Sequence, residues 1–234
     1  MSVDVSVIIP TLNEATEIGR TLDKLRDLAG SFEIIVADGG STDETCELAT
    51  IRKAIVISTE RGRGIQLHAG ALAATGNVLW FLHADSIPPT DAIVLIHKAL
   101  SDDNVVGGNF ALRFDGDSRA VAFMNQFYDK IRHIGLLYGD SGIFVRRDVY
   151  QQIEGFKPLP LFEDLEFVRR LKKCGKLVRV RSEITTSSRR FENRPFLPVF
   201  FRWVTFQCLY WIGISPYRLA RSYHPIRRQT DSEN

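Results

Sequence analysis

Three groups of polar residues have types and spacing that could act on a phosphate-bearing ligand. They are Pro10-Thr-Leu-Asn-Glu14, Asp38-Gly-Gly-Ser-Thr-Asp43 and His83-Ala-Asp85, and each follows a short run of apolar, strand-like residues. Carboxylates at strand ends can hydrogen-bond a ribose or a base, or hold a divalent cation that bridges phosphates. Each acid alone is equally well explained as a turn or helix-start residue. Asp38 and Asp85 together, at neighbouring strand ends, favour a nucleotide-diphosphate site.

A basic segment adds a second feature of this kind. Arg61-Gly-Arg-Gly-Ile-Gln66 places two arginines at a predicted helix start, where backbone N–H groups and the helix dipole favour an anion. A flexible basic loop explains the same residues equally well.

An acidic cluster opens another predicted helix. Glu163-Asp-Leu-Glu166 begins it, and Lys172 and Lys173 close it. Acids at the start and bases at the end of a helix simply complement its dipole, which is one interpretation. The other is a general base that takes a proton from an incoming hydroxyl group.

The elements that position these groups alternate along the first hundred residues. Strands are predicted at 5–10, 32–37, 54–58 and 78–82, with helices between them. Thr11 with Glu14, and Ser41 with Glu44, form capping-box patterns that predict two of the helix starts. This alternation predicts an α/β fold with a parallel sheet, in which ligands bind beyond the carboxyl ends of the strands.

The later part of the chain is less regular. Helices are predicted at 90–100, 118–134 and 163–174, and strands at 105–114 and 143–145, the former with an irregularity at Gly107-Gly108. With no repeat and no linker, residues 1–188 are predicted to form one continuous domain, followed by an appendage at 189–234.

Composition excludes several classes of protein. The 234 residues are 44% hydrophobic and 25% charged, which suits a globular domain with a sizeable core. Three distant cysteines argue against a disulfide framework or a zinc site and favour a reduced, cytoplasmic compartment. The start of the chain does not have the pattern of a signal peptide. Neither GxGxxG after the first strand nor a P-loop is present, so hydride transfer and P-loop chemistry are disfavoured.

Charge and aromatic residues are unevenly distributed. Residues 1–188 carry 22 basic and 25 acidic side chains, whereas residues 189–234 carry 8 and 3. The near-neutral body argues against nucleic-acid binding. Eight of the 24 aromatic residues lie within 195–217, a stretch that Arg202 and Arg218 bound too closely for a membrane-spanning helix. Segment 195–228 is therefore either a peripheral membrane contact or a helix that packs on the core or in a homodimer interface.

The order of these segments resembles the family 2 glycosyltransferases of the GT-A fold over roughly residues 3–186. The resemblance rests on the three groups above together with Arg63-Gly-Ile-Gln66 and Phe162-Glu-Asp-Leu-Glu166. It implies a mostly parallel central sheet flanked by helices. A nucleotide-sugar-binding half at 1–100 would be merged with an acceptor-binding half at 101–188, and a C-terminal helical segment would follow.

The resemblance also implies a role for each site residue. The donor-binding residues would be Pro10, Thr11, Glu14, Asp38, Gly39, Arg63, Gln66 and Ala84. Asp85 matches the last acid of the DxD-type motif, which holds the metal, and Asp164 matches the catalytic base. The first acid of that motif is replaced by His83, which is either a metal ligand or, as the residues alone favour, a strand-end histidine.

The implied activity is inverting, metal-dependent sugar transfer. The donor would be a nucleoside diphosphate sugar, with UDP favoured, and the cofactor manganese or magnesium. The acceptor would carry a hydroxyl or carboxyl group and could be lipid-like, as a carotenoid acid is. The enzyme would be cytoplasmic or peripheral on the inner face of the cell membrane. The alternatives are an impaired sugar-nucleotide-binding or membrane-scaffold protein and, less favoured, a nucleotidyltransferase.

Overall fold

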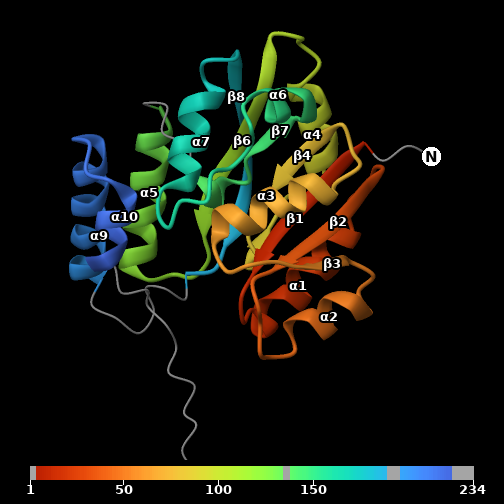
Figure 1. The fold of residues 1–234 in the computed structure, drawn as a ribbon, viewed down its shortest axis with the longest axis horizontal. Helices are drawn as coiled ribbons and strands as arrows, with labels where there is room; N and C mark the ends of the chain where they lie inside the picture. Colours follow the sequence, from red (N-terminus) through yellow and green to blue (C-terminus); the bar gives the residue numbers. More distant parts are fainter. Residues whose placement is uncertain (1–3, 134–137, 189–195, 223–234) are drawn as a thin grey trace, which may run out of the picture.

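The computed structural model describes residues 4–133, 138–188 and 196–222. Its centre is an eight-stranded sheet of order β3-β2-β1-β4-β7-β6-β8-β5, with helices packed on both faces (Figure 1). The strands are β1 (Val5–Thr11), β2 (Phe32–Asp38), β3 (Ile55–Ser58), β4 (Val78–Phe81), β5 (Ser86–Ile87), β6 (Val105–Phe114), β7 (Phe144–Arg146) and β8 (Lys176–Thr186). The predicted α/β class is confirmed.

The helices follow the predicted positions closely in the first two-thirds of the chain. They are α1 (Ala15–Arg26), α2 (Thr45–Ile51), α3 (Arg63–Ala73), α4 (Ala92–Ala99), α5 (Arg119–His133), α6 (Arg147–Gln152), α7 (Glu163–Leu171), α9 (Phe196–Trp211) and α10 (Pro216–Ser222), with a 3₁₀ turn, η1 (Gly139–Ser141). Strands β5 and β8 and helix α6 were not predicted. The alternation of β8 is weak, because only some of its side chains are buried.

The first four strands form the predicted parallel unit. β1 pairs in parallel with β2 on one side and with β4 on the other, and β2 pairs in parallel with β3. The chain therefore adds β2 and β3 on one side of β1 and β4 on the other side. In open parallel sheets, ligands bind where the order of strand addition reverses in this way. In this register Thr11 lies opposite Asp38, so the two strand ends reach the same edge.

The rest of the sheet is mixed rather than parallel. β7 runs antiparallel to both β4 and β6, β5 runs antiparallel to β8, and only the β6–β8 pair is parallel. Among the described residues, four of the seven strand pairs are parallel, so the expectation of a mostly parallel sheet is confirmed, and every antiparallel pair involves β5 or β7. Strands β5 and β7 are only two and three residues long, so they give a weaker sequence pattern than the strands of the first part.

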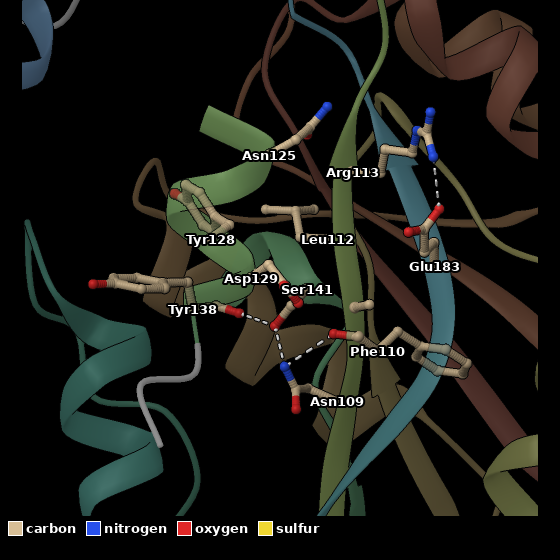
Figure 2. A pocket seen from close by; sticks show the side chains of 11 residues that line it. Asn109, Phe110, Leu112, Arg113, Asn125, Tyr128, Asp129, Tyr138, Ser141 and Glu183 are labelled. Atoms are coloured by element: carbon tan, nitrogen blue, oxygen red, sulfur yellow. Dashed lines mark hydrogen bonds and ion pairs between the residues drawn. The ribbon is translucent and has the colours of Figure 1, made fainter. Parts of the chain in front are cut away.

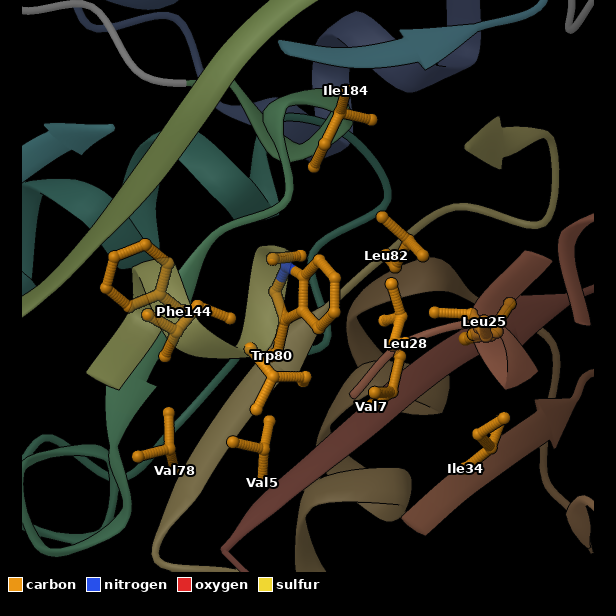
Figure 3. Close-up of a cluster of buried hydrophobic side chains, with 14 of the residues drawn as sticks. Val5, Val7, Leu25, Leu28, Ile34, Val78, Trp80, Leu82, Phe144 and Ile184 are labelled. Atoms are coloured by element: carbon orange, nitrogen blue, oxygen red, sulfur yellow. The ribbon is translucent and has the colours of Figure 1, made fainter. Parts of the chain in front are cut away.

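The core is divided between the two faces of the sheet. Alternate residues of β1 point to opposite faces, with Val5, Val7 and Ile9 in one cluster and Ile8 in the other. Trp80 occupies the middle of the first cluster, near Phe144 and Ile184 (Figure 3). Burial on both faces explains why β4 is apolar throughout and why Ser6 is the one polar residue between Val5 and Pro10 of β1.

The two capping boxes predicted from the sequence are wrong. Helices α1 and α2 begin at Ala15 and Thr45, and neither has a side-chain hydrogen bond at its N-cap. Thr11 instead belongs to β1, and both Thr11 and Ser41 direct their hydroxyl groups to Asp38. The hydroxyl groups of Thr11 and Ser41 thus bind the buried carboxylate of Asp38, so they do not cap the helices that follow them.

The C-terminal helices pack on the body at the end of the molecule opposite β3. Helix α9 lies beside α5, with α10 next to it (Figure 1). Phe200 contacts Phe123 and Phe127 edge-on, at ring-centroid distances of 5.4 and 5.1 Å. Of the segment predicted to contact a membrane, Pro195 and residues 223–228 lie outside the described residues. No helix among the described residues has the length and apolarity needed to cross a bilayer.

The glycine pair in β6 has a packing reason that can be tested. A Cβ on Gly108 would lie 2.2 Å from the backbone oxygen of Val178 in β8 and 2.7 Å from the Phe144 ring. We expect Gly108→Ala to lower the free energy of unfolding by about 1–3 kcal/mol, because the backbone oxygen cannot rotate away. Urea unfolding measures the change. Ala111→Ser, which adds an atom on the same strand, is the control, and an equal effect of both would contradict this explanation.

Candidate active site

A cavity of about 160 Å³ opens where β1 and β4 end. The residues that line it are Pro10, Thr11, Leu12, Glu14, Arg63, Gln66, His83, Ala84 and Asp85. The loop after β1, the start of α3 and the segment after β4 thus meet at one place. Eight of the predicted site residues are brought together there, and Leu12 is an addition.

Asp38 lies behind this cavity and is not part of its lining. The side chain is 3% exposed, and its carboxylate accepts hydrogen bonds from the Ser41 N–H at 2.7 Å, the Gly40 N–H at 3.0 Å and the Thr11 hydroxyl at 2.9 Å. Burial alone would raise the pKa of Asp38, but these donors outweigh it and hold the pKa below its usual value. Asp38 therefore fixes the ends of β1 and β2 as a carboxylate, and base contact by it or Gly39 stays a prediction.

Gln66 joins the same two strand ends from α3. It is 5% exposed, and its Nε2 donates to the backbone oxygens of Thr11 at 2.7 Å and Ala37 at 2.9 Å. A Cβ on Gly39 would come within 3.0 Å of the Gln66 amide, so the glycine allows this close approach. Both amide protons of Gln66 thus bind backbone oxygens of the strand ends. Gln66 lines the cavity with the rest of its side chain.

The loops after β1 and β2 are tied directly to each other. The Asn13 N–H donates to the Ser41 hydroxyl, and the Thr42 N–H donates to the Asn13 side-chain oxygen, both at 2.8 Å. The Glu14 N–H donates to the Thr45 hydroxyl at 2.8 Å. These bonds hold the wall formed by residues 10–14 before any ligand binds.

The DxD-type segment follows β4 directly. Thr21 donates a hydrogen bond to the Ala84 oxygen at 2.7 Å, and Thr186 at the end of β8 lies 3.3 Å from the Asp85 carboxylate. His83 and Asp85 both line the cavity and offer a nitrogen and an oxygen ligand. Within the described ranges, no three His, Cys, Asp or Glu side chains form a metal cluster. A cation at Asp85 therefore fits if ligand phosphate oxygens complete its coordination.

Arg63 connects this cavity to the start of α7. Its guanidinium forms an ion pair with Glu163, and its Nη2 lies 3.9 Å from the Asp164 carboxylate. Burial alone would lower the pKa of Arg63, but Glu163, Asp164 and Asp140 together raise it, so the arginine is a permanent cation here. The arginine predicted from the donor motif thus also contacts the predicted catalytic acid.

Glu163 and Asp164 have different surroundings although they are adjacent. Glu163 is 2% exposed, and burial together with the neighbouring Asp164 raises its pKa even though Arg63 opposes the shift. Asp164 accepts the Gly139 N–H at 2.8 Å on one oxygen and the Leu165 N–H at 2.8 Å on the other. A carboxylate has about four acceptor positions, so Asp164 can still accept a hydrogen bond from a hydroxyl group.

The residue before this pair has an unusual backbone. Phe162 precedes α7 with φ 61°, in the left-handed region that a phenylalanine rarely adopts. Its ring stacks on Tyr210 of α9, with centroids 4.7 Å apart. Sequence reasoning missed this contact, because the aromatic spacing of the C-terminal segment gives no partner for any one ring.

A second cavity, of about 230 Å³, lies between α5, β6 and η1 and was also missed (Figure 2). Its lining is Asn109, Phe110, Ala111, Leu112, Arg113, Asn125, Tyr128, Asp129, Tyr138, Ser141 and Glu183. Burial raises the pKa of Tyr138 to about 12, so its hydroxyl stays protonated. Tyr138 immediately precedes Gly139, the residue that binds Asp164, so this cavity adjoins the predicted base.

Residues 6–160 match the family described as glycosyl transferase family 2. The chain belongs to this family. The match covers the first cavity and the loop that leads to α7, so the predicted resemblance is confirmed.

Relatives within the family are similar over part of their length. A PGL/p-HBAD biosynthesis glycosyltransferase of Mycobacterium bovis is 42% identical over 88 residues, which are 34% of each chain. An undecaprenyl-phosphate 4-deoxy-4-formamido-L-arabinose transferase of Pectobacterium carotovorum is 33% identical over 156 residues, or 61% of this chain and 48% of the relative. The chain thus spans about a third to a half of the length of these relatives.

Solved structures of glycosyltransferases share the fold. Glucosyl-3-phosphoglycerate synthase of Mycobacterium tuberculosis, in complex with Mn²⁺, UDP and glucosyl-3-phosphoglycerate, has a TM-score of 0.61 at 23% identity, covering 90% of this chain and 80% of that one. The mannosyltransferase PcManGT of Pyrobaculum calidifontis, with GDP-Man and Mn²⁺, has a TM-score of 0.69 at 18% identity and covers 97% and 66%. The family 2 chain therefore has the GT-A type of fold.

The hydrogen bonds to Asp38 predict a specific pH dependence. The pKa of Asp38 is lower in the folded protein than in the unfolded chain, so its carboxylate contributes stability above the unfolded value of about 4. That contribution is lost as the pH falls through the folded pKa. We expect Asp38→Asn to lower the free energy of unfolding by about 1–3 kcal/mol at pH 7, and the deficit to shrink below about pH 4. Urea titrations across this range measure it.

Exposed Asp117 provides the control for this prediction. Asp117→Asn removes the same charge without buried donors, so its effect should be small at both pH values. A deficit of Asp38→Asn that stayed constant down to pH 2.5 would contradict the assigned role.

Proposed function

We propose that this family 2 chain is an inverting glycosyltransferase that uses a nucleoside diphosphate sugar. The carrying observation is that the cavity at the ends of β1 and β4 is joined through Arg63 to Asp164 at the start of α7. A donor site and a basic carboxylate thus lie on either side of one guanidinium. Inverting transfer requires a donor and a base in such an arrangement, with the acceptor between them.

The donor would occupy the cavity with its diphosphate toward Asp85. Asp85, with His83 beside it, would hold a divalent manganese or magnesium ion, and carboxylate and phosphate oxygens suit both ions. Such an ion neutralises charge on the leaving diphosphate. The Mn²⁺ complexes of the two fold relatives support this cofactor. Their nucleotides differ, UDP in one and GDP-Man in the other, and we favour UDP on the relative with higher identity.

The chemical step assigned to the protein is one proton transfer. The acceptor oxygen forms a bond to the anomeric carbon from the face opposite the diphosphate, and the bond to the diphosphate oxygen breaks with its electron pair. Asp164 takes the proton that the acceptor hydroxyl loses. The Gly139 N–H orients the carboxylate, and the guanidinium of Arg63 lies 3.9 Å from it.

The charges around Asp164 favour a hydroxyl acceptor over a carboxylate. Glu163, Asp164 and Asp140 all act on the guanidinium of Arg63, so three carboxyl groups of the described residues share this cation. These acids would repel a further carboxylate on the acceptor, whereas they would not repel a neutral hydroxyl group. The name of the undecaprenyl-phosphate relative supports a lipid-borne acceptor, without bearing on its reacting group.

A non-catalytic sugar-nucleotide-binding scaffold is the main alternative, because His83 replaces an acid of the motif. A nucleotidyltransferase is disfavoured, since residues 10–14 contain neither a glycine-rich loop nor a basic residue. An assay of sugar release from a panel of nucleotide sugars in the presence of Mn²⁺ distinguishes the glycosyltransferase from these alternatives. Release of the sugar to water or to an acceptor supports the glycosyltransferase. UDP binding by calorimetry without turnover of any donor supports the scaffold.

Replacement of the proposed base gives the first test. We expect Asp164→Asn to reduce sugar release about 10²–10⁴-fold while leaving the affinity for UDP and Mn²⁺ close to that of the wild type, because the amide cannot accept the proton. Steady-state turnover and calorimetry measure the two effects. Glu47→Gln, on α2, removes an exposed carboxylate outside both cavities as the control. Turnover of Asp164→Asn near the wild-type rate would contradict the assignment.

Replacement of the proposed metal ligand gives a different result. We expect Asp85→Asn to weaken UDP binding about tenfold or more in the presence of Mn²⁺, because a carboxylate ligand is lost. In the presence of EDTA, the variant and the wild type should bind UDP equally. Calorimetry under both conditions checks this, and an equal loss with and without the metal would show that Asp85 acts on the donor without a cation.

A further inference from the structure

We propose that α9 and α10 dock this protein on an anionic lipid surface. The docking itself follows from the described surface of these helices. Its consequence, that the acceptor is reached from that surface, rests on the proposed sugar transfer.

Between Phe201 and Ile212, one side of α9 and of the turn that follows it is exposed and carries no charged residue. Phe201, Thr205, Cys208 and Ile212 recur at intervals of four, three and four residues, which places them on one side of the helix line. Phe201 is 62% exposed and Ile212, just beyond the helix end, 75%. Trp211 beside this stripe is 56% exposed. The stripe thus has an exposed large apolar side chain at each end, Phe201 and Ile212, with the small Thr205 and Cys208 between them, and such exposed apolar side chains favour contact with another apolar phase.

This stripe is not a core face that lacks its partner, because α9 is already packed on its other side. Trp203, Gln207 and Tyr210 are spaced to face inward, and Gln207 is 4% exposed. Gln207 Nε2 lies 2.8 Å from the Tyr138 hydroxyl, and the Trp203 ring lies 5.5 Å from that of Tyr138. The helix thus has a packed face and a separate exposed one.

The charges of the two helices identify the occupant. Residues 196–222 contain Arg202, Arg218 and Arg221 and no acidic residue. An apolar stripe flanked only by arginines matches the boundary between acyl chains and anionic headgroups. A second copy fits less well, since a twofold contact would bring two such acid-free surfaces together.

The packed face of α9, the helix that carries the docking surface, contacts residues on either side of the proposed base. Tyr210, on the packed face of α9, stacks on Phe162, the residue before Glu163 and Asp164. Tyr138, bound to Gln207, immediately precedes Gly139, whose N–H binds Asp164. Two short routes therefore join the exposed stripe to the carboxylate, so docking would set Asp164 close to the lipid surface.

Vesicle co-sedimentation tests the proposal with the full chain. Vesicles of phosphatidylcholine with an equal share of phosphatidylglycerol are compared with vesicles of phosphatidylcholine alone. We expect binding to the anionic vesicles that weakens with salt. Phe201→Ser with Ile212→Ser should reduce it about tenfold or more, because two exposed apolar side chains no longer insert. Arg218→Glu with Arg221→Glu should reduce binding to the anionic vesicles alone.

Ile51→Ser is the matched control, because Ile51 is 66% exposed on α2 at the far end of the molecule. It should leave vesicle binding within about twofold. Equal binding of the wild type to both vesicle types, or unchanged binding of the Phe201 and Ile212 double variant, would overturn the proposal. So would light scattering that shows a wild-type dimer and a monomeric double variant, since the stripe would then be a dimer interface.

Release of sugar from the donor to water separates this proposal from the proposed function. The Phe201 and Ile212 double variant should release sugar at the wild-type rate while losing vesicle binding, which also shows that it folds. Vesicle binding by a wild type that turns over no donor would support the docking surface and refute the enzyme activity.

Discussion

The ion pair between Arg63 and the two acids that begin α7 is the interaction on which the site depends. Glu163 is almost fully buried, and a buried carboxylate is costly unless a cation accompanies it. Its partner lies 100 residues earlier in the chain, at the start of α3, so the pair holds α3 against α7. Because Arg63 also lines the cavity at the ends of β1 and β4, the charge that stabilises the acids is the charge that a diphosphate would meet. One side chain therefore contacts both the cavity and Asp164.

The loops that line the cavity at the ends of β1 and β4 are held in place for a separate reason, which is the register in which β1 pairs with β2. Because Thr11 and Asp38 are paired, the two strand ends deliver a hydroxyl and a carboxylate to the same point. Asp38 then collects the amides of Gly40 and Ser41, and Gln66 bridges both strand ends from α3. Several residues that the family motifs mark as ligand contacts thus use some of their hydrogen-bonding groups to hold the strand ends and loops together. Preorganisation of this kind lowers the cost of binding, since the loops do not have to become ordered with the ligand.

The first hundred residues could be predicted well because their physics is local. Strands such as β4 are buried on both faces and are apolar throughout, and the polar loops that follow β1 and β4 mark the edge at which the first cavity opens. Two kinds of feature could not be read in this way. Thr11 and Ser41 look like helix caps in sequence, and only the fold reveals that Asp38 competes for their hydroxyl groups. The stacking of Phe162 on Tyr210 joins residues 48 positions apart, and no periodicity or spacing signals such a pair.

That stacking gives the C-terminal helices a structural reason to lie where they do. A left-handed phenylalanine costs of order 1–3 kcal/mol and persists only when its surroundings hold it. Tyr210 supplies such a hold, and Gln207 and Trp203 fix Tyr138 on the other side of Asp164. The basic, aromatic segment that stands out in composition is therefore not independent of the acidic body. The packed face of α9 contacts the residues on either side of Asp164, and its exposed face carries no acidic residue. The near-zero net charge of the chain conceals the difference between the acidic residues 1–188 and the basic residues 189–234.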